Sequence, residues 1–191
     1  NTILNLKMQK AKIDVWGVGT KLITAYDQPA LGAVYKIVSM EDDQGVMHDT
    51  IKLSNNAEKV STPGKKQVWR ITSRAKGKSE GDYITFADTD VNALEEINMF
   101  HPTYTYINKT VRDFDAVPLL VPIYDKGQLI YELPSLDEIK AYATKELDEL
   151  WNEYKRVLNP QDYPVDLAKD VWDNKMTLID NVRKKAHDLS E

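Results

Sequence analysis

The feature that most constrains this chain is a short apolar run that breaks at two glycines and a hydroxyl residue. The run is Ile13-Asp14-Val15-Trp16, the break is Gly17-Val18-Gly19-Thr20, and Lys21-Leu22-Ile23 follows. Glycine has no Cβ and accepts positive φ, so such a turn presents consecutive backbone N–H groups to an anion at short range. The sequence therefore predicts a phosphate-binding turn. The alternative is a plain tight turn, because the segment lacks the rest of the dinucleotide and P-loop signatures.

The residues in front of this turn predict a helix. Residues 2–12 place Leu4, Met8 and Ala11 at helical spacing. A helix, a short strand and a glycine turn form one unit of an α/β barrel, and barrel enzymes bind phosphate at the loops after their last strands. The chain does not begin with Met and its first residues already have a helical pattern. We therefore expect residues 1–25 to be the last part of an α/β barrel, with the phosphate-binding loop, whose N-terminal part is missing.

The middle of the chain, residues 26–134, alternates apolar and polar residues and is expected to be mainly antiparallel β structure, as a sheet or a sandwich. One hairpin is expected from 33–40 and 50–54, and a second from 67–73 and 82–87 around the loop 74–81. A later ribbon is expected from 104–111 and 116–123, turning at 125–127 into 128–131.

The last part, residues 135–191, is predicted to be helical, which makes the fold class α+β. Ser135 and Glu138 form a capping box. The apolar stripe that follows predicts one helix to Leu158, ended by Asn159-Pro160, and a second helix is expected from about Leu167. Apolar faces at helical spacing are more typical of a core or a subunit contact than of a cofactor site.

Composition excludes several classes of protein. A net charge of -5 and a pI near 5.3 argue against general nucleic-acid binding. No apolar run approaches the ~20 residues of a membrane-spanning helix. Cysteine is absent, which excludes disulfides and thiolate metal sites and favours a reducing, cytoplasmic location.

Two further groups of residues, a set of lysines and the histidines, are candidates for a functional role. The loop 59–66 carries lysines around Pro63-Gly64, and Lys65 and Lys66, together with Lys21, could form a positive lip for a phosphorylated ligand. The alternative is a solvated loop with a type II turn. The three histidines, His48, His101 and His187, are expected at turns or helix ends, so no catalytic residue and no metal ligand is assigned.

Four segments of the chain, in this order, resemble a known family: 14–22, 28–36, 51–54 with 59–70, and then 99–102 with 133–136. The family is the nicotinate phosphoribosyltransferases, and the resemblance covers only the C-terminal part of such an enzyme. It implies that the barrel remnant expected at 1–25 belongs to a phosphoribosyltransferase-type α/β barrel. It implies transfer of ribosyl 5-phosphate from phosphoribosyl pyrophosphate to nicotinate, giving nicotinate mononucleotide in NAD biosynthesis, with ATP hydrolysis and thus in the ligase class.

The resemblance also implies site residues, cofactors and partners. In the family the 5′-phosphate rests on the glycine turn, which matches Gly17, Val18, Gly19 and Thr20. Mg²⁺, ATP and a transiently phosphorylated histidine belong to the chemistry, and they are expected mostly outside this chain, which would be inactive alone. A homodimer is expected. The rival hypothesis is a non-catalytic β-plus-helix module for binding or oligomerisation, since no acid–base pair or nucleophile cluster is recognisable.

Overall fold

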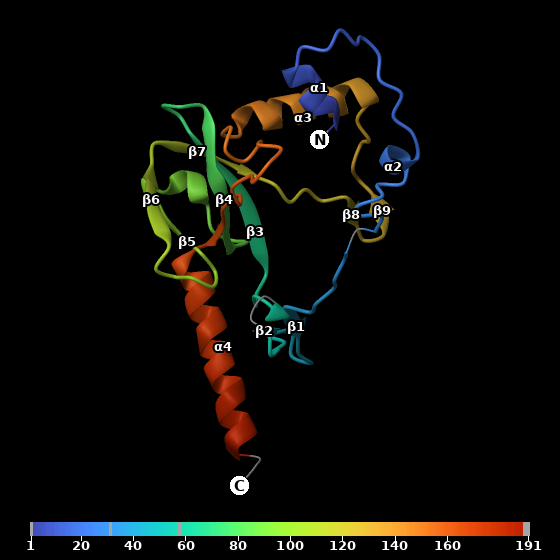
Figure 1. Cartoon of the computed structure of the whole chain (residues 1–191). Helices are drawn as coiled ribbons and strands as arrows, with labels where there is room; N and C mark the ends of the chain where they lie inside the picture. Colours follow the sequence, from blue (N-terminus) through green and yellow to red (C-terminus); the bar gives the residue numbers. More distant parts are fainter. Residues whose placement is uncertain (1, 31, 57–58, 189–191) are drawn as a thin grey trace. The chain divides into compact units, whose positions relative to one another are not determined.

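The structure is a computed structural model that describes residues 2–30, 32–56 and 59–188. It divides into two compact units, residues 1–35 and 36–191, and each is described by itself. Figure 1 labels the elements of both.

The first unit contains two short helices and no strand among its described residues. Helix α1 is Thr2–Met8, as the sequence predicts, and α2 is Thr20–Ile23. The strand expected at 13–16 is absent, and residues 11–19 have no regular secondary structure. A barrel strand needs neighbouring strands to pair its N–H and C=O groups, and the described part of this unit offers none. The expected barrel remnant is therefore not confirmed.

The second unit begins with a small hairpin. Strand β1 (Ser39–Glu41) pairs antiparallel with β2 (Met47–Asp49), with Met40 opposite His48. The Asp42 carboxylate holds the turn by accepting from the N–H groups of Gln44 and Val46 at 2.9 Å. The hairpin confirms the predicted turn at 41–45, but its strands differ from the expected 33–40 and 50–54. Strand β2 ends at Asp49, and residues 50–54 form no strand.

A six-stranded mixed sheet follows, in the order β6-β5-β10-β4-β3-β7. The strands are β3 (Lys66–Ser73), β4 (Lys78–Phe86), β5 (Glu96–Phe100), β6 (Asn108–Arg112), β7 (Phe114–Pro118) and β10 (Val165–Leu167). The β3–β4 hairpin confirms the second predicted hairpin. The predicted ribbon differs, because β6 pairs with β5 and β7 pairs with β3.

The sheet is strongly curled, as Figure 1 shows. Strands β6 and β7 stand at opposite ends of the sheet order, yet Asp113 alone separates them in the chain. Consecutive Cα atoms lie ~3.8 Å apart, so the two edges must approach each other there. Asp113 makes the sharp change of direction with a φ of 52°. A second small hairpin, β8 (Tyr124–Asp125) with β9 (Gln128–Leu129), confirms the turn predicted at 125–127.

The C-terminal part differs from the prediction in two places. Helix α3 (Leu136–Glu149) begins at the expected capping box but ends nine residues before Leu158. Trp151 leaves the helical path because its indole N–H donates to the carbonyl of Ser79 on β4. Helix α4 (Lys169–Asp188) begins two residues after Leu167, which belongs to β10 instead.

Strand β10 lies between β4 and β5, pairing parallel with β4 and antiparallel with β5. This strand is a correction to the expected helical region 135–191, and its parallel pairing with β4 departs from the mainly antiparallel structure expected for the sheet. Residues 165–167 pair with backbone N–H and C=O groups of β4 and β5, whose facing edges would otherwise be open. This pairing explains why the segment is a strand and not the first turn of a helix.

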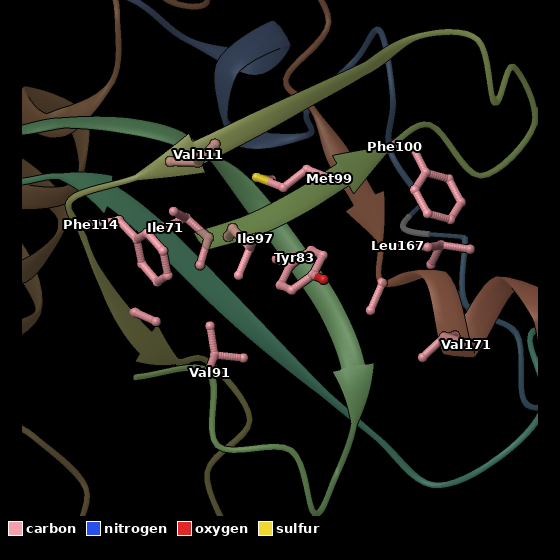
Figure 2. Packing of buried hydrophobic residues seen from close by; sticks show 12 residues of the cluster. Ile71, Tyr83, Val91, Ile97, Met99, Phe100, Val111, Phe114, Leu167 and Val171 are labelled. Atoms are coloured by element: carbon pink, nitrogen blue, oxygen red, sulfur yellow. The ribbon is translucent and has the colours of Figure 1, made fainter. Parts of the chain in front are cut away.

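The core lies inside the curl of the sheet and reaches the start of α4. Figure 2 shows the buried side chains, which come from every strand of the sheet, from the 3-10 helix η2 (Val91–Ala93) and from the start of α4. Its most deeply buried members are Ile71, Val91, Met99, Leu167 and Val171. The core thus brings together residues separated by about half of the chain.

Gly64 connects the loop 59–66 to the first hairpin by a close approach. Its φ is +86°, in accord with the expected turn at Pro63-Gly64, and its N–H donates to the carbonyl of Val38 at 2.9 Å. A Cβ at this position would lie 2.6 Å from the Phe86 ring and 2.9 Å from the Asp49 carboxylate. Only glycine fits here without displacing its neighbours.

We expect Gly64→Ala to lower the free energy of unfolding by about 2 kcal/mol, the sum of backbone strain and a steric clash. The control is Gly77→Ala, where φ is also positive (+59°) but a Cβ has nothing within 4 Å. Urea unfolding followed by tryptophan fluorescence measures both variants. Equal losses would show that the close approach to Phe86 and Asp49 contributes nothing.

Candidate functional site

The predicted phosphate-binding turn is fully exposed in the first unit. Gly17, Val18 and Gly19 precede α2, and Thr20 is its first residue. Neither glycine has positive φ, and a Cβ on either would have nothing within 4 Å. The sequence analysis expected glycine here because it accepts a positive φ, and that expectation is wrong for this turn. The remaining reason is room for another molecule to come close to the backbone.

The backbone N–H groups of this turn are available. Within the described part of the chain, no hydrogen bond engages the N–H groups of residues 17–21. The carbonyl of Gly19, in contrast, accepts from the N–H groups of Leu22 and Ile23. Exposed, unengaged N–H donors are what a backbone needs in order to bind an oxyanion.

The three lysines of the predicted lip lie in different surroundings. The Lys21 ammonium lies 5.2 Å from the centre of the Tyr26 ring, in the first unit. In the second unit, Lys65 is exposed. Lys66 instead donates to carbonyls of its own loop, those of Thr62 at 2.7 Å, Pro63 at 3.2 Å and Gly64. Burial lowers the pKa of Lys66.

Lys66 therefore holds its loop together, and Lys65 keeps an exposed charge. The lip that would combine these lysines with Lys21 stays a prediction.

His48 and His101 hold turns of the chain by hydrogen bonds. The Nε2 atom of His48 lies 2.7 Å from the carboxylate of Asp42 in the first hairpin, and this hydrogen bond lowers the pKa of Asp42. The Nδ1 atom of His101 accepts from the N–H groups of Thr103 and Tyr104, each at 3.0 Å. His187 lies in the last turn of α4.

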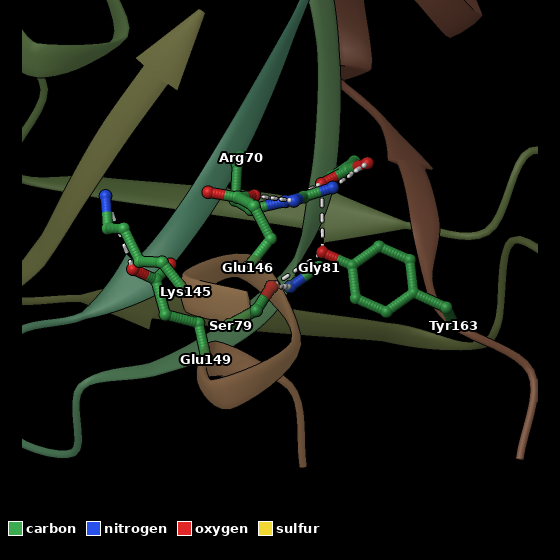
Figure 3. A network of polar contacts seen from close by, with 8 residues as sticks. Arg70, Ser79, Gly81, Lys145, Glu146, Glu149 and Tyr163 are labelled. Carbon is green, nitrogen blue, oxygen red and sulfur yellow. Dashed lines mark hydrogen bonds and ion pairs between the residues drawn. The ribbon is translucent and has the colours of Figure 1, made fainter. Parts of the chain in front are cut away.

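A polar network that the sequence analysis missed ties the C-terminal segment to the sheet (Figure 3). Arg70 on β3 donates through Nε to Asp82 on β4 at 3.0 Å, and through Nη1 to Glu146 on α3. The Tyr163 hydroxyl donates to Asp82 at 2.9 Å and lies 2.6 Å from the Ser79 hydroxyl. The only local signal was a charged residue inside the alternating strand 67–73, since its partners are distant in sequence.

The network shifts the ionisation of its members. Hydrogen bonding to Asp82 and the nearby carboxylates raise the pKa of Arg70 against the opposing effect of its burial. Burial raises the pKa of Tyr163 to about 12, from an ordinary value of 10.0. Tyr83, buried in the core, has its pKa raised to about 12 for the same reason.

Arg70→Leu should lower the free energy of unfolding by about 3 kcal/mol, because it leaves the mostly buried carboxylates of Asp82 and Glu146 without their cation. Arg70→Lys should recover part of the loss, since an ammonium keeps the charge but lacks the several fixed N–H donors of a guanidinium. The control is Arg74→Leu, which removes exposed ion pairs to Asp113 and Asp115 and should cost under about 1 kcal/mol. Similar losses for Arg70→Leu and Arg74→Leu in urea unfolding would contradict this assignment.

Stability should fall between pH 10 and pH 12, because unfolded tyrosines ionise near 10.0 while Tyr163 and Tyr83 keep their protons to about 12 in the fold. The raised pKa makes this contribution complete below pH 10 and absent above pH 12. Tyr163→Phe should flatten the decline, whereas Tyr124→Phe, on an exposed side chain, should not. Unfolding curves across this pH range measure the effect, and a decline that is identical in Tyr163→Phe would refute it.

Comparison with known proteins identifies the family. Residues 65–175 match the sequence model of the nicotinate phosphoribosyltransferase C-terminal domain. The chain is 53% identical over 191 residues to the nicotinate phosphoribosyltransferase of Bacillus subtilis (strain 168), covering 100% of this chain and 39% of that protein. It is 32% identical over 168 residues to the human protein of the same name, covering 87% of this chain and 30% of that one.

A solved structure agrees. The crystal structure of human nicotinic acid phosphoribosyltransferase matches with a TM-score of 0.56 and 28% identity, over 62% of this chain and 24% of that chain. The chain thus spans well under half the length of the relatives it matches. The family's C-terminal domain matches more than half of the residues of this chain. The chain therefore belongs to the nicotinate phosphoribosyltransferase family.

Proposed function

We propose that this chain forms the C-terminal portion of an enzyme that joins nicotinate to the ribosyl 5-phosphate of phosphoribosyl pyrophosphate. The products are nicotinate mononucleotide and pyrophosphate, and ATP is hydrolysed to ADP and phosphate in the same cycle. The observation that carries this proposal is the run of unengaged N–H donors at residues 17–21 in a member of this family. The chain spans 39% of its Bacillus subtilis relative, and we assign the catalytic histidine to the part of the enzyme outside this chain.

The turn acts by positioning. Backbone N–H groups of Gly17, Val18 and Gly19, with the Thr20 hydroxyl, hold the 5′-phosphate so that the anomeric carbon of the ribose faces nicotinate. A fixed phosphate removes translational and rotational freedom from the reacting sugar before the transfer, which lowers the barrier. Donors already in place need no reorganisation when charge develops.

ATP and Mg²⁺ enter this proposal from the family resemblance. Among the residues that the structure describes, no group of three or more His, Asp or Glu side chains could hold a metal ion. These residues therefore do not fit a Mg²⁺ site by themselves, and no step is assigned to the ion here. The described helices include none that could cross a membrane. A homodimer and a cytoplasmic location stay predictions.

A second candidate function is a non-catalytic module for binding or oligomerisation. It is favoured by the apolar side chains Ile139, Tyr142 and Leu147, which α3 leaves about half exposed or more. The two functions differ at the glycine turn. The enzyme needs phosphate contacts there, whereas a module of this kind needs none.

Gly19→Val should raise the KM for phosphoribosyl pyrophosphate at least about tenfold, which corresponds to about 1.4 kcal/mol of lost binding. A Cβ at Gly19 has nothing within 4 Å, so the added side chain obstructs an approaching ligand and does not clash with the first unit. The measurement is formation of nicotinate mononucleotide by the full-length protein at varied phosphoribosyl pyrophosphate, with and without ATP.

The matched control is Gly32→Val, which also places its side chain in open space but lies outside the turn. It should leave the KM unchanged. An unaltered KM in Gly19→Val would remove the phosphate-binding role of the turn, and no product from the unaltered protein would favour the non-catalytic module.

A further inference from the structure

The loop that joins β5 to β6, residues 101–107, is closed by a side-chain atom that can take up a proton. At the base of the loop, the N–H of His101 donates to the carbonyl of Ile107 at 2.9 Å. Inside the loop, Nδ1 of His101 accepts from the N–H groups of Thr103 and Tyr104, each at 3.0 Å. A single ring nitrogen therefore holds two backbone donors.

The sequence explains which donors this nitrogen holds. Pro102 has no N–H group, so Thr103 and Tyr104 offer the first backbone donors after His101. Asn and Asp side chains close similar turns by accepting from N–H groups a few residues ahead. Histidine differs from asparagine in one respect that matters here, because its charge changes near neutral pH.

Protonation of the ring and closure of the loop exclude each other. Nδ1 accepts only while it carries no proton, so the neutral ring of His101 has its proton on Nε2. A second proton turns Nδ1 into a donor that faces two other donors. A half-turn of the ring does not repair this, since it places a carbon where the acceptor was.

Two carboxylates face His101 from the neighbouring segment. Asp162 and Asp166 line the same cavity as His101, and Asp166 belongs to β10. Burial raises the pKa of Asp166, and the charges of Lys109 and His101 act in the opposite direction. A protonated ring that leaves the turn therefore finds negative charge on this side of the cavity.

The remaining titratable groups near His101 do not cancel this attraction. Lys109, on β6, donates to the carboxylate of Glu80 at 3.1 Å, and this partner offsets its positive charge. Burial raises the pKa of Tyr163 to about 12, so its phenol is uncharged near neutral pH.

The loop also forms one wall of the cavity, which has a volume of about 620 Å³. Tyr104 and Ile107 line this wall, and the Tyr104 ring stacks on His101 with centroids 5.0 Å apart and planes at 33°. The two side chains are 53% and 52% exposed, so core packing contributes little to holding them in place. Loss of the His101 contacts releases this wall.

We propose that His101 is an acid-sensitive latch on the loop 101–107. The neutral ring keeps the loop closed, and protonation of the ring frees the N–H groups of Thr103 and Tyr104 and opens the wall of the cavity. This device does not depend on the proposed transfer reaction.

His48 provides a contrast within the same protein. Its Nε2 lies 2.7 Å from the carboxylate of Asp42, so a proton on this ring adds charge to an existing hydrogen bond. Acid should therefore preserve the hairpin contact of His48 and break the loop contacts of His101.

The test is hydrogen–deuterium exchange of the full-length protein, read by mass spectrometry on a peptide spanning 100–108 and corrected for intrinsic exchange at each pH. The closed loop excludes the second proton, so its stability is complete above the titration of the open ring and falls below it. Because a histidine in water is half protonated at a pH of about 6.5, protection should fall about tenfold between about pH 7.5 and pH 5.5.

Three variants assign the effect. His101→Asn keeps an acceptor for Thr103 and Tyr104 but does not titrate, so the peptide should stay protected at both pH values. His101→Ala should lose the protection at both. His48→Asn should leave the response of the peptide as it is in the unaltered protein.

Three outcomes would overturn the proposal. The first is equal protection of the peptide at the two pH values in the unaltered protein. The second is a tenfold loss that persists in His101→Asn, which would assign the titration to Asp162 or Asp166. The third is a response that His48→Asn removes.

Discussion

The second unit depends on one short pairing, that of β10 with β4. Without these three residues the six-stranded order would divide into β6-β5 and β4-β3-β7. The Asp82 N–H donates to the carbonyl of Pro164 at 3.0 Å, and the Ala168 N–H donates to the carbonyl of Ile84 at 2.9 Å. Gly81 permits this contact, because its Cβ would lie 2.8 Å from the Pro164 ring. A strand from the end of the chain thus completes a sheet begun a hundred residues earlier.

The same pairing sets the positions of side chains on both sides of it. Tyr163, just before β10, reaches Asp82 and joins the Arg70 network that holds α3. Val171, just after β10, enters the core. The register of β10 therefore places Tyr163 in the polar network and Val171 in the core.

Local patterns predicted much of this structure, and long-range contacts account for the rest. Ser135 and Glu138 showed the start of α3, and the turns at Asp42 and Gly127 showed two hairpins, because capping and turn chemistry act within a few residues. The end of α3 could not be predicted, since Trp151 leaves the helix to bond Ser79. Nor could β10, whose two partners are distant in sequence. At the glycine turn, the sequence indicated the residues whose backbone N–H groups are unengaged. The reason it gave for glycine, a positive φ, does not apply to Gly17 or Gly19.

Native-state hydrogen exchange tests the role of β10 most directly. If β10 holds the two parts of the sheet together, the amides of Asp82 and Ala168 should exchange as slowly as those at the centre of β3 and β4, through global unfolding alone. The amides of α3, which buries no residue completely, should exchange faster. Rapid exchange at Ala168, with β3 and β4 still protected, would show that the sheet is stable without β10 and would contradict this account.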